Sequence, residues 1–270
     1  MSDNSLSPAE TPPDPLQLAL ARTPARVLAG RSGPGYRTAT LLQLREDHAA
    51  ARDAVQAEVD LLRDFGAERI EKYRLFTVQT QAASKAEFLL RPDLGRKLNE
   101  ESREHLLSRC QTGRDFQVII GDGLSAAAVA TQAPKLLDRL CESSFHRGWT
   151  FGQPFLIRYC RVGAINDIGE LLKSEVVVLL IGERPGMATA ESLSAYMAYR
   201  PRIGHTDAQR NLISNIHARG VGIDEAAARI VALAEQFRQM GKSGVDVKEV
   251  IHHGFRSILT GADDPSRSSQ

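Results

Sequence analysis

A glycine-rich loop carrying two charged residues follows an apolar run within residues 176–186. The six apolar residues at 176–181 predict a strand that is buried on both faces. Two glycines and a proline at 182–186 cannot continue a central strand, so the chain leaves the sheet there, with Glu183 and Arg184 in the loop. Ligands of open parallel sheets bind beyond the carboxyl ends of the strands. The loop is therefore a candidate ligand-binding loop, and the alternative is a tight turn with a solvated ion pair.

A second glycine-rich loop, at 121–126, follows the apolar residues 116–120. Its sequence, Gly-Asp-Gly-Leu-Ser-Ala, matches the G-x-G-x-x-A pattern that binds the pyrophosphate of a dinucleotide. Two features count against that function. Asp122 places a carboxylate where the pyrophosphate must approach backbone amides, and residues 154–162 end without an acidic residue for the ribose. The structural alternative is the beginning of a helix with Ser125 as its N-cap.

Other catalytic motifs are absent from the sequence. There is no G-x-x-x-x-G-K-[ST] loop, no H-E-x-x-H, no C-x-x-C and no G-x-S-x-G, and no histidine pairs with a second ligand at metal spacing. We therefore predict no catalytic residue and no metal site in this chain. The three cysteines, Cys110, Cys141 and Cys160, are odd in number and far apart, which predicts reduced thiols in a cytosolic protein.

The elements that must position these loops alternate between strands and helices. Strands are expected at 116–120, 154–159 and 176–181, with helical segments at about 126–139 and 167–173 between them. This order predicts an α/β fold with a Rossmann-like, doubly wound parallel sheet. Right-handed crossovers would place the three exit loops on one edge of that sheet.

Composition shifts divide the chain into four parts. Residues 1–22 are rich in proline and polar residues and predict a mobile N-terminal tail. Residues 23–108 show helical spacing of apolar residues and predict a small helical domain. Residues 109–248 hold the Rossmann-like domain, and residues 249–270 predict a polar C-terminal tail.

The overall composition excludes several classes of protein. The chain has 270 residues, 42% of them hydrophobic, and a net charge of +1, which disfavours disorder and nucleic-acid binding. No apolar run approaches the ~20 residues of a membrane span, and no secretory signal opens the chain.

Nine short segments together resemble a known family, the small (light) subunit of ethanolamine ammonia-lyase, an adenosylcobalamin-dependent enzyme. In order, these segments lie at 23–27, 29–34, 47–55, 91–96, 122–125, 158–162, 181–186, 191–194 and 213–217. The resemblance implies a helical domain followed by a Rossmann-like domain that binds cobalamin. It also implies that ethanolamine binds and reacts in a TIM barrel of the large subunit, and that the two subunits form a higher-order hetero-oligomer.

The resemblance further implies three cofactor-binding residues, Val162, Glu183 and Leu212. The family has a cysteine where this chain has Leu212, so that contact is retained if it uses backbone atoms and altered if it uses the thiol. Glycine is expected at the position of Cys160. No D-x-H-x-x-G motif is present, which favours cobalamin that keeps its own dimethylbenzimidazole as the lower ligand of cobalt.

The same resemblance implies a cytoplasmic complex, of a family often associated with bacterial microcompartments. It explains why a chain with ligand loops lacks a catalytic residue set. Two alternatives are a nucleotide-dependent oxidoreductase that uses the loop at 121–126 and a non-catalytic interaction protein.

Overall fold

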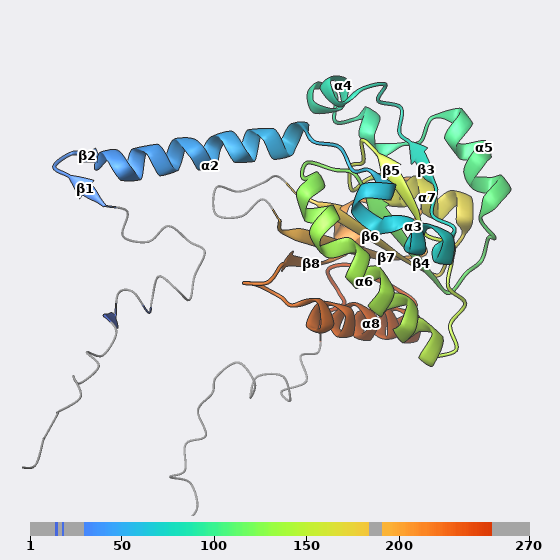
Figure 1. The fold of residues 1–270 in the computed structure, drawn as a ribbon. Helices are drawn as coiled ribbons and strands as arrows, with labels where there is room; N and C mark the ends of the chain where they lie inside the picture. Colours follow the sequence, from blue (N-terminus) through green and yellow to red (C-terminus); the bar gives the residue numbers. More distant parts are fainter. Residues whose placement is uncertain (1–13, 16–17, 19–29, 184–190, 250–270) are drawn as a thin grey trace, which may run out of the picture.

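A six-stranded mixed sheet forms the centre of the protein (Figure 1). The structure is a computed structural model that describes residues 14, 15, 18, 30–183 and 191–249. The strand order across the sheet is β3 (Thr77–Gln79), β5 (Phe155–Arg158), β4 (Phe116–Gly121), β6 (Val176–Gly182), β7 (Leu193–Tyr199) and β8 (Asn211–Ile216). The first four strands are parallel, and β7 and β8 are antiparallel to their neighbours.

Helices connect and cover these strands. They are α2 (Thr38–Gln56), α3 (Leu61–Tyr73), α4 (Lys85–Leu90), η1 (Leu94–Arg96), α5 (Glu100–Arg109), α6 (Ala126–His146), α7 (Ala164–Leu172), η2 (Asp207–Gln209) and α8 (Ile223–Met240). A short hairpin, β1 (Arg31–Ser32) with β2 (Gly35–Tyr36), precedes α2. None of the helices in the described part of the chain is both long and apolar enough to cross a membrane.

Two hydrophobic cores lie on opposite faces of the sheet. Alternate residues of each strand point to opposite faces, so Val178 of β6 packs with α3, α6 and α8, and Leu179 packs with α5 and α7. All seven residues of β6 are buried. The predicted strand with two buried faces is therefore confirmed, and helices cover both faces of the sheet (Figure 1).

The prediction of a wholly parallel sheet is wrong for β7 and β8. Residues 183–192 are all that separate β6 from β7, and residues 200–210 are all that separate β7 from β8. A parallel crossover needs about a dozen residues or more, usually with a helix, so each of these short connections returns the chain antiparallel. The mixed α/β class is confirmed, and the Rossmann-like assignment stays a prediction.

The segment predicted as a helical domain, 23–108, also contributes to the sheet. Its strand β3 pairs with β5, and its helices α3 and α5 pack on opposite faces of the sheet. Helix α2 has no buried residue and extends away from the rest of the fold (Figure 1). The boundary between 108 and 109, like the extent of the two tails, stays a prediction.

Candidate functional site

Three loops meet at the carboxyl edge of the parallel strands. They follow β4, β5 and β6 and begin at Asp122, Tyr159 and Glu183. The registers Gly121↔Ile157 and Gly121↔Ile181 place the three strand ends level with one another. The predicted gathering of the three exit loops on one edge is therefore confirmed.

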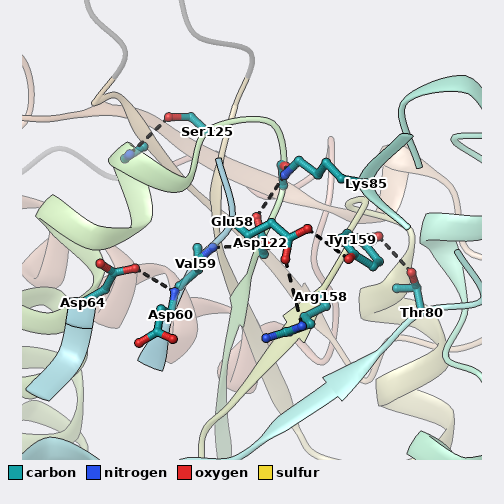
Figure 2. A network of polar contacts seen from close by, with 12 residues as sticks. Glu58, Val59, Asp60, Asp64, Thr80, Lys85, Asp122, Ser125, Arg158 and Tyr159 are labelled. Carbon is teal, nitrogen blue, oxygen red and sulfur yellow. Dashed lines mark hydrogen bonds and ion pairs between the residues drawn. The ribbon is translucent and has the colours of Figure 1, made fainter. Parts of the chain in front are cut away.

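The loop after β4 is held by a buried ion pair (Figure 2). The Asp122 side chain is fully buried and the Lys85 side chain is 7% exposed, with 3.2 Å between Nζ and Oδ1. The ammonium of Lys85 also donates to the Gly123 carbonyl at 2.9 Å, and the amide of Val59 donates to Asp122 Oδ2. Burial raises the pKa of Asp122, and the neighbouring Lys85 opposes that rise.

Backbone hydrogen bonds join this loop to the other two. The Cys160 amide donates to the Asp122 carbonyl at 2.8 Å, and the Leu124 amide donates to the Gly182 carbonyl at 3.0 Å. The close approach of the loop to β6 requires glycine on both sides. A Cβ at Gly123 would lie 2.7 Å from the Gly182 oxygen, and a Cβ at Gly182 would lie 1.9 Å from the Ser125 oxygen.

The loop after β5 begins with a left-handed residue. Tyr159 has φ of 57°, an uncommon conformation for a residue that is not glycine. Thr80 Oγ1 donates to its carbonyl at 3.0 Å, and the Tyr159 hydroxyl donates to Glu58 Oε1 at 3.0 Å (Figure 2). Burial and the bond to Glu58 raise the pKa of Tyr159. These contacts fix the direction in which the chain continues toward Val162.

The three loops and Tyr196 of β7 line a cavity of about 250 Å³. Its lining is mostly apolar and includes one carboxylate, one phenol and one guanidinium: Gly123, Leu124, Cys160, Arg161, Val162, Ile181, Gly182, Glu183 and Tyr196. Two of the predicted cofactor contacts, Val162 and Glu183, thus line the same cavity. The Tyr196 hydroxyl donates to Glu183 Oε1 at 2.8 Å, and burial followed by this bond raises the pKa of Tyr196.

The third predicted contact, Leu212, lies beside the cavity. It is directly opposite Tyr196 in the β7–β8 register, and its side chain is 45% exposed. Directly opposed residues of an antiparallel pair place their side chains on the same face of the sheet. Leu212 therefore extends the apolar surface on the Tyr196 side of the cavity without lining the cavity itself. The predicted ion-pair partner of Glu183, Arg184, lies outside the described residues.

The geometry of the loop at 121–126 favours a structural interpretation. The Ser125 side chain accepts a hydrogen bond from the Ala128 amide at 3.2 Å, so the predicted N-cap of α6 is confirmed. The Leu124 amide is occupied by Gly182, and Asp122 is buried against Lys85. The glycines thus serve contacts within the protein, and a pyrophosphate would meet a carboxylate rather than open amides.

The cysteines are free thiols in the structure. Cys160 is fully buried, and its burial strongly raises the pKa of its thiol. Its sulfur would lie 3.1 Å from a Cβ at Gly121, so the side chain that replaces the expected glycine fills space over β4. Among residues 30–183 and 191–249, no cluster of three or more His, Cys, Asp or Glu could hold a metal ion.

Sequence reasoning missed two side chains of this site. Tyr196 binds Glu183, and Lys85 balances the charge of Asp122. Lys85 begins a six-residue helix that lies 37 positions before its partner, so no local spacing connects the two. Tyr196 belongs to a strand that the alternation of helices and strands did not predict.

Comparisons with known proteins agree on one family. The family model for the ethanolamine ammonia-lyase light chain (EutC) matches residues 13–248. The ethanolamine ammonia-lyase small subunit of Clostridium perfringens is 40% identical over 228 residues, which cover 84% of this chain and 75% of that protein. The small subunit of Clostridioides difficile is 41% identical, and the match covers 84% of this chain and 76% of that protein. The small subunit of Clostridium acetobutylicum is 40% identical, and the match covers 84% of this chain and 92% of that protein.

The buried ion pair makes a specific prediction about stability. Lys85→Met leaves the buried Asp122 carboxylate without its counter-charge, which lowers the free energy of unfolding by about 3–5 kcal/mol at pH 8. Burial raises the pKa of Asp122 in the folded state above the ordinary Asp pKa of about 4. The neutral carboxyl group therefore contributes stability at a pH below the ordinary pKa, and this contribution is lost as the pH rises through the folded-state pKa. The difference in free energy of unfolding between the wild type and Lys85→Met is therefore smaller at pH 5 than at pH 8, as measured by urea unfolding.

Two variants serve as controls for this measurement. Adding Asp122→Asn to Lys85→Met removes the unpaired charge and recovers part of the lost stability at pH 8. Lys72→Met removes a cation that pairs with Asp138 at the surface, 3.7 Å away, and changes stability by less than about 1 kcal/mol. Equal effects of Lys85→Met and Lys72→Met would show that the buried pair does not support the loop.

Proposed function

The chain belongs to the ethanolamine ammonia-lyase light-chain family, and we propose that it binds adenosylcobalamin where it meets the large subunit of that enzyme. The observation that carries the proposal is the cavity at the carboxyl edge of the sheet, which brings Val162 and Glu183 together. Both positions are cofactor contacts that the family resemblance assigns. Leu212 adds a third contact on the neighbouring strand.

The chemistry of the cavity suits the rim of a corrin ring. That rim bears neutral amide arms with apolar edges between them. Glu183 offers carboxylate oxygens to amide N–H groups, and one of these oxygens is already oriented by Tyr196. Leu124, Val162 and Ile181 offer apolar contact. Residues that combine a few placed polar groups with an apolar surface are typical of ligand sites.

The size of the cavity supports a site shared with a partner. Pockets that enclose a drug-sized ligand have volumes of about 300–1,000 Å³. A cavity of about 250 Å³ accommodates one edge of a ligand as large as cobalamin, so a second surface must cover the remainder. The large subunit, with its TIM barrel and bound ethanolamine, supplies that surface in this proposal.

The role of this chain in the reaction is binding and assembly. When bound, adenosylcobalamin supplies homolysis of its cobalt–carbon bond, which begins the radical conversion of ethanolamine to acetaldehyde and ammonia. This chain provides contacts to the cofactor and a surface for the large subunit, and the ammonia-lyase activity belongs to the complex. The exposed helix α2 is a further candidate contact surface. We place the resulting hetero-oligomer in the cytoplasm, in association with a microcompartment where the host has one.

Removal of the Glu183 carboxylate tests the cofactor contact. Glu183→Ala leaves a corrin N–H without its acceptor, which costs about 1–3 kcal/mol, or roughly a ten- to hundredfold loss of cobalamin affinity. The affinity for ethanolamine changes far less, because the substrate binds to the other subunit. Titration of cobalamin into the assembled complex, followed by its visible absorbance, measures the effect.

Two variants accompany this titration. Glu142→Ala removes an exposed carboxylate near the end of α6 and leaves cobalamin affinity unchanged. Tyr196→Phe removes the hydroxyl that orients Glu183 and produces a smaller loss than Glu183→Ala. Equal affinities of Glu183→Ala and the wild type would exclude the ligand role of Glu183.

Partnership is tested by reconstitution. We expect the chain alone to fold without deaminating ethanolamine and to become part of an active complex on addition of the large subunit. The purified complex with added cofactor should show the visible absorbance of a corrin, whereas a nicotinamide enzyme would absorb only near the ultraviolet edge and an interaction protein would show neither band. Turnover of ethanolamine by the chain alone would contradict the proposal.

The lower ligand of cobalt is tested by isotope labelling. Without a D-x-H-x-x-G motif, we expect cobalamin to keep its own dimethylbenzimidazole on cobalt. In electron paramagnetic resonance of the Co(II) form, ¹⁵N in the dimethylbenzimidazole should then change the hyperfine pattern. A change caused instead by ¹⁵N-histidine in this chain would exclude the base-on form.

A further inference from the structure

A second and larger cavity adjoins the cofactor cavity. Its volume is about 540 Å³, and Arg161 and Val162 line both cavities. It lies over the beginning of α7, between the segment around η1 and the connection from β7 to β8. A ligand seated against Val162 could therefore extend from the first cavity into the second.

Positive charge dominates the wall of this second cavity. Four cationic side chains line it: Arg96, Lys97, Arg161 and Arg210. Two carboxylates also line it, and both already have cationic partners. Asp167 pairs with Arg103, which lies outside the cavity lining, and Asp207 pairs with Arg210 and is 91% exposed. The excess of cations favours an anionic ligand.

Two buried donors in the same wall have no partner within the described part of the protein. The Arg210 side chain is 7% exposed and binds Asp207 and Asn166 through its terminal nitrogens, while its Nε has no acceptor. His205 Nδ1 is likewise buried without a partner. Leaving a buried donor unsatisfied is costly, so both N–H groups favour an acceptor in the cavity.

The tautomer of His205 supports its role as a donor. The Nε of Arg202 donates to His205 Nε2 at 3.1 Å, which leaves the ring proton of neutral histidine on Nδ1. Burial, with the charges of Arg202 and Arg210, lowers the pKa of His205. The ring is therefore neutral near pH 7, and its Nδ1–H has no acceptor among the described residues.

The helix beneath the cavity contributes its dipole. The first-turn amides of Ala164, Ile165 and Asn166 donate to the carbonyls of residues 161–163, so hydrogen bonds to a ligand must come mainly from side chains. The N-terminal end of the helix still carries partial positive charge. Gly163 permits Arg96 to lie close to this end, because a Cβ there would be 3.0 Å from Arg96 Cγ.

From these observations we propose that the second cavity is a phosphate subsite, which binds the phosphodiester of the corrinoid's nucleotide arm through Arg210, His205 and Arg96. The inference rests on the proposed function, because it assumes that a corrin occupies the adjoining cavity. Cobalamin carries a single phosphodiester, on the arm that ends in dimethylbenzimidazole. Guanidinium groups with free N–H donors suit phosphate oxygens by both charge and geometry. A free phosphate has the same chemistry, and the experiment distinguishes the two sources.

The test compares two corrinoids on the complex with the large subunit. Cobinamide has the corrin ring but lacks the nucleotide arm with its phosphate. In phosphate-free buffer, Arg210→Gln should lower the affinity for cobalamin about tenfold or more and change that for cobinamide by less than about twofold. Arg96→Gln, at an exposed position, should act in the same direction with a smaller effect. Arg200→Gln, which removes a 66% exposed arginine outside the cavity, is the control and should affect neither.

Inorganic phosphate identifies the source of the anion. Added phosphate should weaken cobalamin binding to the wild type and leave cobinamide binding unchanged. The phosphate-subsite proposal would be overturned if Arg210→Gln and Arg96→Gln lowered the affinities for cobalamin and cobinamide equally, or lowered neither affinity. Phosphate that binds alongside cobalamin without competition would assign the cavity to a free anion and overturn the nucleotide-arm proposal. If the wild-type complex binds neither corrinoid, the proposed function fails, and this inference fails with it.

Discussion

The candidate site depends on one buried charge and the cation that neutralises it. Asp122 is fully buried, and Lys85 reaches it from the beginning of the short helix α4. From this point the backbone of the β4 loop bonds to the loop after β5 through Cys160 and to the end of β6 through Gly182. A buried carboxylate tolerates few arrangements of its neighbours, because each loss of a partner is costly. The Asp122–Lys85 pair and these backbone bonds therefore stabilise the loops that carry Val162 and Glu183. The side chains that line the cavity remain available to a ligand.

The sequence was informative where burial alone decides structure. The apolar runs at 116–120 and 176–181 are buried on both faces, which is why a count of apolar residues predicts these strands. Ser125 was identifiable as a helix cap because capping acts over three residues. The gathering of the exit loops followed from the geometry of parallel strands. Each of these features depends on neighbouring residues or on the direction of the strands, so each can be predicted from the sequence.

The rest of the site depends on contacts between distant residues. Strands β7 and β8 were not expected, because the alternation of strands and helices ends at β6 and short connections then return the chain. The sequence pattern therefore does not predict Tyr196 as a site residue, although it orients Glu183. From the sequence, Asp122 is expected to place its carboxylate where a pyrophosphate would approach, because nothing near it in the sequence indicates that it is buried against Lys85. Arg210 likewise acquires its position from Asn166, 44 residues away.

The two neighbouring cavities differ in a way that a single ligand can explain. The smaller one combines apolar side chains with a carboxylate acceptor, the larger one adds three further cations and buried donors, and Arg161 lines both. A corrinoid has the matching division, since its ring rim is neutral and rich in amide donors whereas its nucleotide arm carries an anion. Arg161 and Val162 lie at the junction, where the chain leaves the strained Tyr159. In the proposed complex the same loop would serve both halves of the ligand, and the conformation of Tyr159 would set the positions of Arg161 and Val162 in both cavities.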